Sequence, residues 1–314
     1  MEIFSRQQSI EDMLANPETP PELKQKLEHI QRVRVFASHE LHLPDNNSYR
    51  SYVDVERPYL VWNVFAAPEL SLKPYQSCFL VTGCLAYRGY FNKQDAEQFS
   101  DELKQQGYDV FVAGISAYST LGWFDDPVPN TIMHYGDAHL AGLVFHELAH
   151  QQVYVPDDTA FNESFAMAVE LAGVQQWMKH AGNKALYAEY KKDKQQREQF
   201  IAMLMQTRQE LNSLYLSNEN NKPDKKKTIL SNLKSRYSKE KNKWNNDRYD
   251  GYMKQELNNA HFISVGLYHH YVPAFKKLFE QNNHDWRVFF EKVKQLGNLP
   301  RDERKQKLKQ LSAG

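Results

Sequence analysis

Several features that mark other protein classes are missing from this sequence of 314 residues. No run of roughly eighteen or more apolar residues occurs, which excludes a membrane-spanning helix. Lysine plus arginine and aspartate plus glutamate each number 39, so no net charge favours nucleic acid or an anionic membrane as a partner. The absence of an internal repeat and of a glycine-rich phosphate loop argues against a repeat architecture and a P-loop nucleotide site.

Cysteine is scarce as well, since only Cys78 and Cys84 occur. Neither their number nor their spacing suits a structural zinc site, which needs four close ligands. Two interpretations stay open. The pair forms a local disulfide between facing strands, which would favour an oxidising compartment, or the two side chains are small buried apolar groups.

The most informative feature that is present is a His-Glu-x-x-His motif, formed by His146, Glu147 and His150 and followed by Glu163. On a helix, positions i and i+4 share one face about 6 Å apart, so both imidazoles can bind one metal ion with Glu147 beside it. Catalytic zinc takes three protein ligands and one water, and two histidines plus one carboxylate is a standard set. The sequence therefore predicts one Zn²⁺ bound by His146, His150 and Glu163. The alternative is two buried histidines satisfied by hydrogen bonds, with Glu163 an ordinary acid near a helix start.

The residues around this motif predict a helical hairpin. We expect Asp137 to cap the first helix and the segment 156–158 to end it. A second helix is expected from near Thr159, with apolar side chains that pack on the first. A tight bend between the two helices would bring Glu163 back to the histidine pair.

The rest of the chain predicts an α+β fold, with a small mixed sheet, the motif-bearing hairpin and a largely helical C-terminal lobe. We expect an N-terminal lobe, residues 1–136, that carries a substrate-edge strand, and a zinc-binding lobe, residues 137–314, both in one catalytic unit. A capping box at Thr19-Pro20-Pro21-Glu22 predicts a helix that ends before Pro44. The other expected elements are a helix over Lys93 to Gln105 and strands over Tyr59 to Phe65, Phe79 to Thr82, Leu85 to Tyr90 and Asp109 to Ile115.

A polar stretch runs from Lys191 to Tyr249 and contains a lysine cluster at residues 222–227. Its alternating charges and spaced leucines predict two long helices joined by an exposed turn. A basic contact patch is the alternative, but lysines without interleaved aromatic residues are a poor signature for nucleic acid.

Residues 162–173 resemble a helix of gluzincin aminopeptidases, Asn-Glu-Gly-Phe-Ala-x-x-Val-Glu, in which the first Glu binds zinc. In those enzymes this Glu usually lies further from the second histidine than it does here. The chain more closely resembles the predicted-aminopeptidase family of bacterial proteins, many of which are lipoproteins. The matching blocks extend over most of the chain: Leu43-Pro44-Asp45, Val61-Trp62-Asn63-Val64, Ala86-Tyr87-Arg88-Gly89-Tyr90-Phe91, Ala117-Tyr118-Ser119-Thr120-Leu121-Gly122-Trp123, Phe145 to Gln151 and Leu257-Asn258-Asn259-Ala260.

The resemblance implies a zinc metallopeptidase that hydrolyses peptide bonds, with aminopeptidase action first and endopeptidase action as the alternative. Zinc would lower the pKa of its bound water, and Glu147 would act as general base and then general acid. A catalytically idle, membrane-tethered binding protein is the rival from another class. Because family members often begin with a lipoprotein signal, the native form is expected in the periplasm, held to the membrane only by a lipid anchor that this chain lacks. Peptide is the expected partner, nucleic acid is not, and the oligomeric state stays open.

Two further residues complete the expected catalytic site. Such sites usually add a donor that stabilises the oxyanion, and Tyr268 is our first choice, although a packed tyrosine with a satisfied hydroxyl is the alternative. Tyr268 is expected on one helix with Asn259, His261 and Tyr271. Glu170 is expected to support a ligand histidine through a hydrogen bond and not to bind the metal itself.

The segment before the motif is the expected substrate template. In gluzincins the strand before the zinc helix pairs with the substrate backbone, and Val112 to Trp123 takes that place here. The expected substrate-binding residues are Tyr118, Ser119, Thr120 and Gly122, with an ordinary passage from strand to loop as the alternative. Asp125 and Asp126 are candidates for holding a free α-amino group, although paired acids before a proline are also common in turns.

Overall fold

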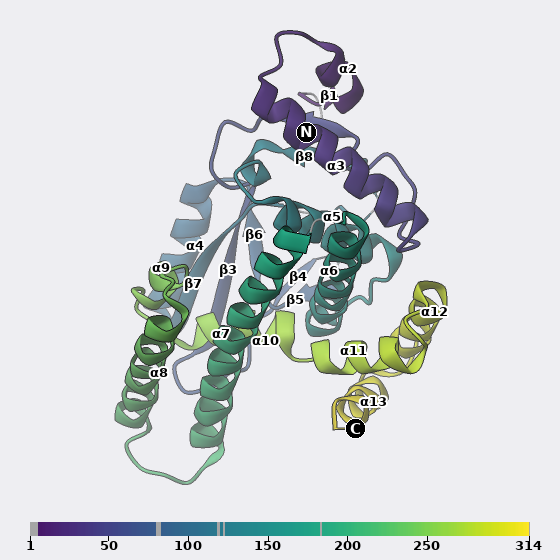
Figure 1. Cartoon of the computed structure of the whole chain (residues 1–314). Coiled ribbons are helices and arrows are strands. Elements are labelled where there is room, and N and C mark those ends of the chain that lie inside the picture. The colour runs from purple at the N-terminus through teal and green to yellow at the C-terminus, as the bar shows by residue number, and fades with distance from the viewer. Residues whose placement is uncertain (1–5, 80–82, 118–119, 122, 183, 314) are drawn as a thin grey trace. The chain divides into compact units, whose positions relative to one another are not determined.

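The computed structural model describes residues 6–79, 83–117, 120–121, 123–182 and 184–313 (Figure 1). Helices hold 61% of the described residues and strands 11%, in small sheets, so the expected α+β fold with a helical C-terminal region is confirmed. The chain divides into two compact units. The first unit comprises Met1–Val61, Gly114–Tyr187 and His270–Gly314, and the second comprises Trp62–Ala113 and Ala188–His269. The expected lobe boundary at residue 136 stays a prediction.

The first unit is mainly helical, with three very short strands of which β2 lies between β1 and β8. Strand β2 pairs antiparallel with β1 and parallel with β8. Helices α5 and α6 pack along each other, and α3 and α11 contact them (Figure 1). The elements are β1 (Gln8–Ser9), α2 (Ile10–Ala15), α3 (Pro21–His39), β2 (Ser51–Val53), β8 (Val128–Pro129), η1 (Asn130–Ile132), α5 (Asp137–Gln152), α6 (Thr159–His180), α11 (Val272–Gln281), α12 (Trp286–Gly297) and α13 (Arg301–Ala313).

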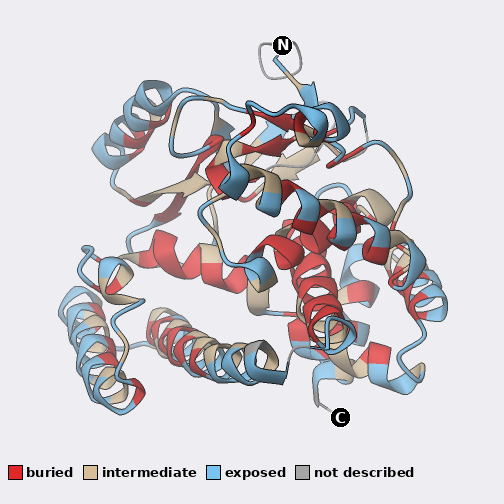
Figure 2. Ribbon diagram, turned by 45° about the horizontal axis from the view of Figure 1, so that its top comes forward, coloured by how far each residue is buried: buried red, intermediate tan, exposed pale blue. Residues whose placement is uncertain are grey.

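Aromatic side chains fill the core of the first unit. Phe161 and Phe165 of α6 contact Phe275 of α11 in edge-to-face geometry, an arrangement that aromatic rings favour. Helices α5 and α6 are buried on most of their faces, as the red ribbon in Figure 2 shows. Gly173 permits their close approach, because a Cβ atom there would lie only 2.8 Å from the ring of Phe145. The sequence that carries the metal-binding motif is therefore core sequence.

Two predicted helix caps were wrong. Helix α5 has Gly136 as its N-cap, and Asp137 is its first helical residue. The Asp137 carboxylate instead lies 3.5 Å from Lys26 Nζ and 3.8 Å from His29 Nδ1, so long-range partners take the group that local sequence assigned to the cap. Helix α3 begins at Pro21 after an N-cap at Pro20, and no side chain caps it.

The second unit combines a three-stranded sheet, in the order β6-β3-β7, with helices. Strands β3 and β6 are antiparallel, with Trp62 opposite Tyr90. Helix α4, which occupies the predicted range, buries Ala96 and Leu103 against the sheet in a core with Trp62 and Val64. The elements are β3 (Val61–Pro68), β4 (Ser77–Phe79), β5 (Gly83–Leu85), β6 (Arg88–Tyr90), α4 (Lys93–Gln105), β7 (Tyr108–Ile115), α7 (Lys184–Leu216), α8 (Lys222–Trp244), α9 (Asp250–Met253) and α10 (Asn259–His269); β3, β7 and α7 each begin or end in the first unit.

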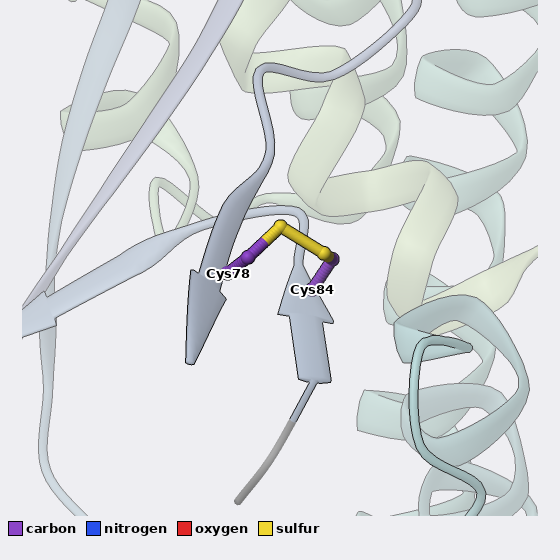
Figure 3. Close-up of a disulfide and its surroundings, with 2 residues drawn as sticks. All are labelled: Cys78 and Cys84. Carbon is purple, nitrogen blue, oxygen red and sulfur yellow. A yellow bond between two sulfur atoms is a disulfide. The ribbon is translucent and has the colours of Figure 1, made fainter. Parts of the chain in front are cut away.

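Cys78 and Cys84 form a disulfide (Figure 3). They face each other across the β4–β5 hairpin, with their Cα atoms 3.9 Å apart. Of the two interpretations left open by the sequence, the structure has the disulfide.

The polar stretch forms two long helices, α7 and α8, as predicted. The turn between them holds an exposed ion pair between Glu219 and Lys225. Buried aromatic side chains close the other end of the hairpin, where Phe200 lies edge-on to Tyr237. In the described part of the chain, none of the helices combines the length and hydropathy that a bilayer span requires.

Candidate active site

Helix α5 places the first two candidate ligands on one face. His146 and His150 lie one helical turn apart, and their ring centroids are 5.0 Å from each other. Buried apolar residues, among them Val144 and Leu148, hold this part of α5 in the core of the first unit. Because the surrounding helix is packed on several sides, the two imidazoles have little freedom to move apart.

The connector between α5 and α6 is short and closed by side chains. The amide of Asn162 accepts a hydrogen bond from Val155 N–H and donates one to Val155 O, both at 2.8 Å. Asp158 is the N-cap of α6, and its carboxylate accepts from the N–H of Phe161 at 3.2 Å. These bonds turn the chain sharply and bring the first turns of α6 back beside α5. Glu163 follows directly after Asn162, so the same turn fixes its position.

Glu163 meets both histidines. Its Oε2 atom lies 3.4 Å from His146 Nε2 and 3.5 Å from His150 Nε2. One ligand atom from each of the three residues lies within 4.8 Å of the others, and all three side chains are buried. Tetrahedral metal bonds of about 2.0–2.1 Å place neighbouring ligand atoms about 3.4 Å apart. The donor set therefore has the spacing and the chemistry of a site for one divalent metal ion.

A second carboxylate supports this group from behind. Glu170 Oε2 lies 3.2 Å from His146 Nδ1, the ring nitrogen that faces away from Glu163. Gly142 leaves the space that Glu170 needs, because a Cβ atom there would lie 3.1 Å from Glu170 Cγ. A histidine that binds metal through one nitrogen commonly donates its other N–H to a carboxylate. The contact expected for Glu170 is present, and its role stays a prediction.

The electrostatics of the site favour a bound cation. Burial opposes the charge on Glu163, but its bonds to His146 and His150 outweigh this and lower its pKa to about 2. Burial likewise disfavours the charged form of His146, yet Glu163 and Glu170 raise its pKa to about 10. Burial raises the pKa of Glu147. Three buried carboxylates thus surround two imidazoles, an arrangement that a divalent ion would stabilise.

The other predicted site residues are placed less directly. Tyr268 lies half-buried on α10 of the second unit, so its assignment to the site in the first unit stays a prediction. Tyr271 is not on α10, because that helix ends at His269 and Tyr271 is the N-cap of α11. The chain turns at residues 269–271 since Tyr271 N–H donates to the buried hydroxyl of Ser164.

The expected substrate edge is described only in part. Strand β7 ends at Ile115, and Tyr118, Ser119 and Gly122 lie outside the described residues. Thr120 N–H donates to Asp126 Oδ2 at 2.9 Å, which places Thr120 at the start of a turn. The roles of these four residues in substrate binding stay predictions.

The sequence did not single out a group of residues that surrounds the end of α5. Gln151, which follows His150, donates to Ser48 Oγ at 3.1 Å and lies 3.4 Å from Asp126 Oδ2. Its Oε1 atom accepts from Asn46 Nδ2 at 2.7 Å. Tyr49 follows in the same loop. Two signals were present in the sequence: Gln151 lies beside a candidate ligand, and Asp126 was a candidate for holding an α-amino group. The other partners of Gln151 come from a distant part of the chain.

A buried His-His-carboxylate group on a helical hairpin places this protein among α+β proteins with a candidate metal site. Comparison with protein families identifies the family: the family model "Putative aminopeptidase" matches residues 1–308, and the chain belongs to this family. Comparison with curated proteins and with solved structures found no significant match.

Proposed function

We propose that this protein is a zinc metallopeptidase that acts as an aminopeptidase. The observation that carries the proposal is the convergence of His146, His150 and Glu163 within 4.8 Å, with the buried Glu147 carboxylate next to them in the chain. A structural zinc site is normally closed by four protein ligands, whereas a catalytic site keeps a position for water. Three ligands with an adjacent acid fit the catalytic arrangement, and the family supports peptide as the substrate.

The residues of the chain would divide the reaction among them. His146, His150 and Glu163 would hold the ion, which supplies a water of lowered pKa and polarises the substrate carbonyl. Glu147 takes the proton of the attacking water and delivers it to the leaving amine. Burial raises its pKa, which makes it a better proton acceptor than an exposed glutamate. Glu170 fixes the ring orientation of His146 through the 3.2 Å contact with Nδ1.

Asp125 and Asp126 are the two candidates for binding a free α-amino group, and Asp126 already accepts a hydrogen bond within the protein. Asp126 is buried and accepts a hydrogen bond from Thr120 N–H. Asp125 is exposed and lies 3.4 Å from Asn47 Nδ2. Aminopeptidase action therefore rests on the family, with endopeptidase action as the alternative.

We also propose a periplasmic location, with the native protein tethered to the membrane by a lipid anchor. The disulfide between Cys78 and Cys84 supports an oxidising compartment, because such bonds seldom persist where thiols are kept reduced.

The test begins with metal content and a single substitution. Purified protein should hold one zinc ion and cleave peptides with free amino termini. Glu147→Gln keeps the shape of the side chain but cannot take a proton, so we expect kcat to fall by about 10² to 10⁴ with zinc content unchanged. Equal cleavage of free and acetylated peptides would support the endopeptidase alternative. A zinc-loaded protein that cleaves no peptide in a broad library, and is unchanged by Glu147→Gln, would be the catalytically idle binding protein.

A further inference from the structure

Tyr49 is a buried tyrosine whose hydroxyl has no hydrogen-bond partner among the described residues. Its side chain is only 2% exposed, so water cannot satisfy the hydroxyl from the surface. A buried polar group without a partner costs about 1–3 kcal/mol. Native proteins contain few such groups, and each calls for an explanation.

The loop that carries Tyr49 is tied to the metal-binding helix. Gln151, at the end of α5, bonds to Asn46 and Ser48 on one side of Tyr49. Tyr49 N–H donates to Asp126 O at 2.6 Å. The buried guanidinium of Arg34 donates to Ser48 O at 3.0 Å. Four contacts therefore hold the backbone at Tyr49 in place, although its hydroxyl stays unpaired.

The backbone of Tyr49 is in the left-handed region, with φ at 64°. For a bulky side chain this conformation costs roughly 1–2 kcal/mol compared with an ordinary one. Such strain persists where the surroundings over-determine the conformation, and it occurs often at functional sites. The strained backbone and the unpaired hydroxyl are two separate costs at one residue.

Glu147 lies one helical turn before Gln151 on α5, so it shares the helix face that the loop around Tyr49 contacts. Burial raises the pKa of Tyr49 well above its usual value, and the charge of Glu147 adds more to this shift than the charge of Asp126 does. The hydroxyl therefore stays protonated and can donate. The Glu147 carboxylate is buried too, and within the described ranges no residue donates a hydrogen bond to it. The unpaired hydroxyl of Tyr49 and the carboxylate of Glu147 thus lie in the same part of the first unit.

We propose that Tyr49 is a positioning residue for Glu147: its hydroxyl donates a hydrogen bond to the Glu147 carboxylate when substrate is bound. One carboxylate oxygen is then held, and the other is free to take the proton of the attacking water. Hydrogen bonds of catalytic groups are often long in the ligand-free protein and tighten in the complex with substrate. This inference rests on the proposed function of Glu147 as the base.

Tyr49→Phe removes one oxygen atom and tests the proposal. We expect kcat to fall by about 10- to 100-fold, as for loss of one strong hydrogen bond, with KM changed by less than about threefold. Zinc affinity should be unchanged. Because the hydroxyl is unpaired in the free protein, the free energy of unfolding should stay the same or rise. Loss of stability together with kcat would assign Tyr49 a structural role and overturn the proposal.

A double-mutant cycle with Glu147→Gln separates this inference from the proposed function. The probe is acetohydroxamate, titrated into cobalt-loaded protein and followed by visible absorbance, which requires no peptidase activity. We expect Tyr49→Phe to weaken binding by about fivefold in the wild-type background and by less than twofold beside Glu147→Gln, since residues that act together are not additive. Equal weakening in both backgrounds, or none in either, would overturn the role of Tyr49. Failure of the wild type to cleave peptides, with this coupling present, would overturn only the peptidase proposal.

The matched control is Tyr52→Phe. Tyr52 is also buried, but burial and the charge of Asp54, not Glu147, raise the pKa of its hydroxyl. This substitution should leave kcat and acetohydroxamate binding unchanged.

Discussion

The chain contains two helical hairpins that treat charge in opposite ways. Helices α5 and α6 of the first hairpin bury five titratable side chains: His146, Glu147, His150, Glu163 and Glu170. In the α7–α8 hairpin, Lys226 is the one buried charged side chain among the residues that are described, and it is paired with Asp109 at 2.5 Å. Most other charges of α7 and α8 are exposed or half-exposed. One hairpin thus places charge in the core, and the other keeps it in solvent.

This difference indicates where function lies. Burying a charge costs free energy unless a partner or a metal compensates it, so a fold that needed only stability would have used apolar residues on α5 and α6. The α7–α8 hairpin shows that this chain can form a long helix pair with a single buried charged side chain, Lys226, among the described residues. The charges of the α5–α6 hairpin are therefore best explained by what they bind.

Removal of a candidate metal ligand should give the largest effect, a loss of zinc affinity, and it tests the contrast between the two hairpins directly. Glu163→Ala deletes a carboxylate that contacts both histidines. Zinc affinity should fall by more than about 100-fold, since loss of an outer-shell partner alone costs 10- to 100-fold. Competition with a chelating dye measures this. Glu210→Ala in α7, which breaks an ion pair with Arg236, is the control and should leave zinc affinity unchanged. Similar losses in both variants would mean that the site is not where we place it.

The anchor of α6 should give the next largest effect, on stability. Arg304 of α13 donates to Asp158 at 2.8 Å and 2.9 Å, and both side chains are buried. Arg304→Met leaves the Asp158 carboxylate buried without its cation, so we expect a loss of about 3–5 kcal/mol in the free energy of unfolding. Urea unfolding measures it. Arg236→Met in α8 removes a partly exposed pair and should cost about 1 kcal/mol or less.

A second variant checks the cause of that loss. Asp158→Asn keeps an N-cap acceptor for α6 but removes the charge. Combined with Arg304→Met, it should recover part of the lost stability, because no unpaired charge remains. An additive loss in the double variant would contradict the ionic explanation.

Sequence predicted best where local signals decide the structure. Helix α4 occupies its predicted range because its apolar residues recur at helical spacing and Asn92 caps it. Helix α6 begins at Thr159, where the second helix was expected, and Asp158 caps it. The approach of His146 to His150 follows from their i, i+4 spacing on one helix.

Features that depend on distant contacts could not be predicted. Asp137 was expected to cap α5, but Lys26 and His29, far away in the chain, take its carboxylate. The loop around Tyr49 bonds to α5 at Gln151, about a hundred residues further on. Strands β1, β2 and β8 hold two or three residues each, too few for a periodic pattern. Propensity and spacing describe neighbours in sequence, whereas these contacts depend on the tertiary fold.

A smaller effect is expected in the pH dependence of stability, where the buried histidines of the two units differ. Neighbouring carboxylates raise the pKa of His146, whereas burial lowers the pKa of His261, in the second unit, to about 4. Below pH 6.5 His261 becomes protonated in the unfolded chain, whereas in the folded protein it stays neutral down to about pH 4. The contribution of His261 to the free energy of unfolding is therefore complete above pH 6.5 and decreases as the pH falls. From pH 7 to pH 5 this amounts to about 2 kcal/mol. The free energy of unfolding of His261→Gln should therefore change less between pH 7 and pH 5 than that of the wild type, as measured by urea unfolding at both pH values. An unchanged slope would mean that the pKa of His261 is the same in the folded and the unfolded protein.

The smallest effect is expected at the exposed turn of the α7–α8 hairpin. Lys225 pairs with Glu219, and both side chains are half-exposed. Exposed ion pairs contribute roughly 0–1 kcal/mol because solvent screens them and ordering long side chains costs entropy. Lys225→Ala should therefore change the free energy of unfolding by less than about 0.5 kcal/mol, and less still at high salt. Zinc content and peptide cleavage should be unaffected. A loss of activity here would show that the polar hairpin takes part in binding, and the contrast between the two hairpins would no longer separate function from scaffold.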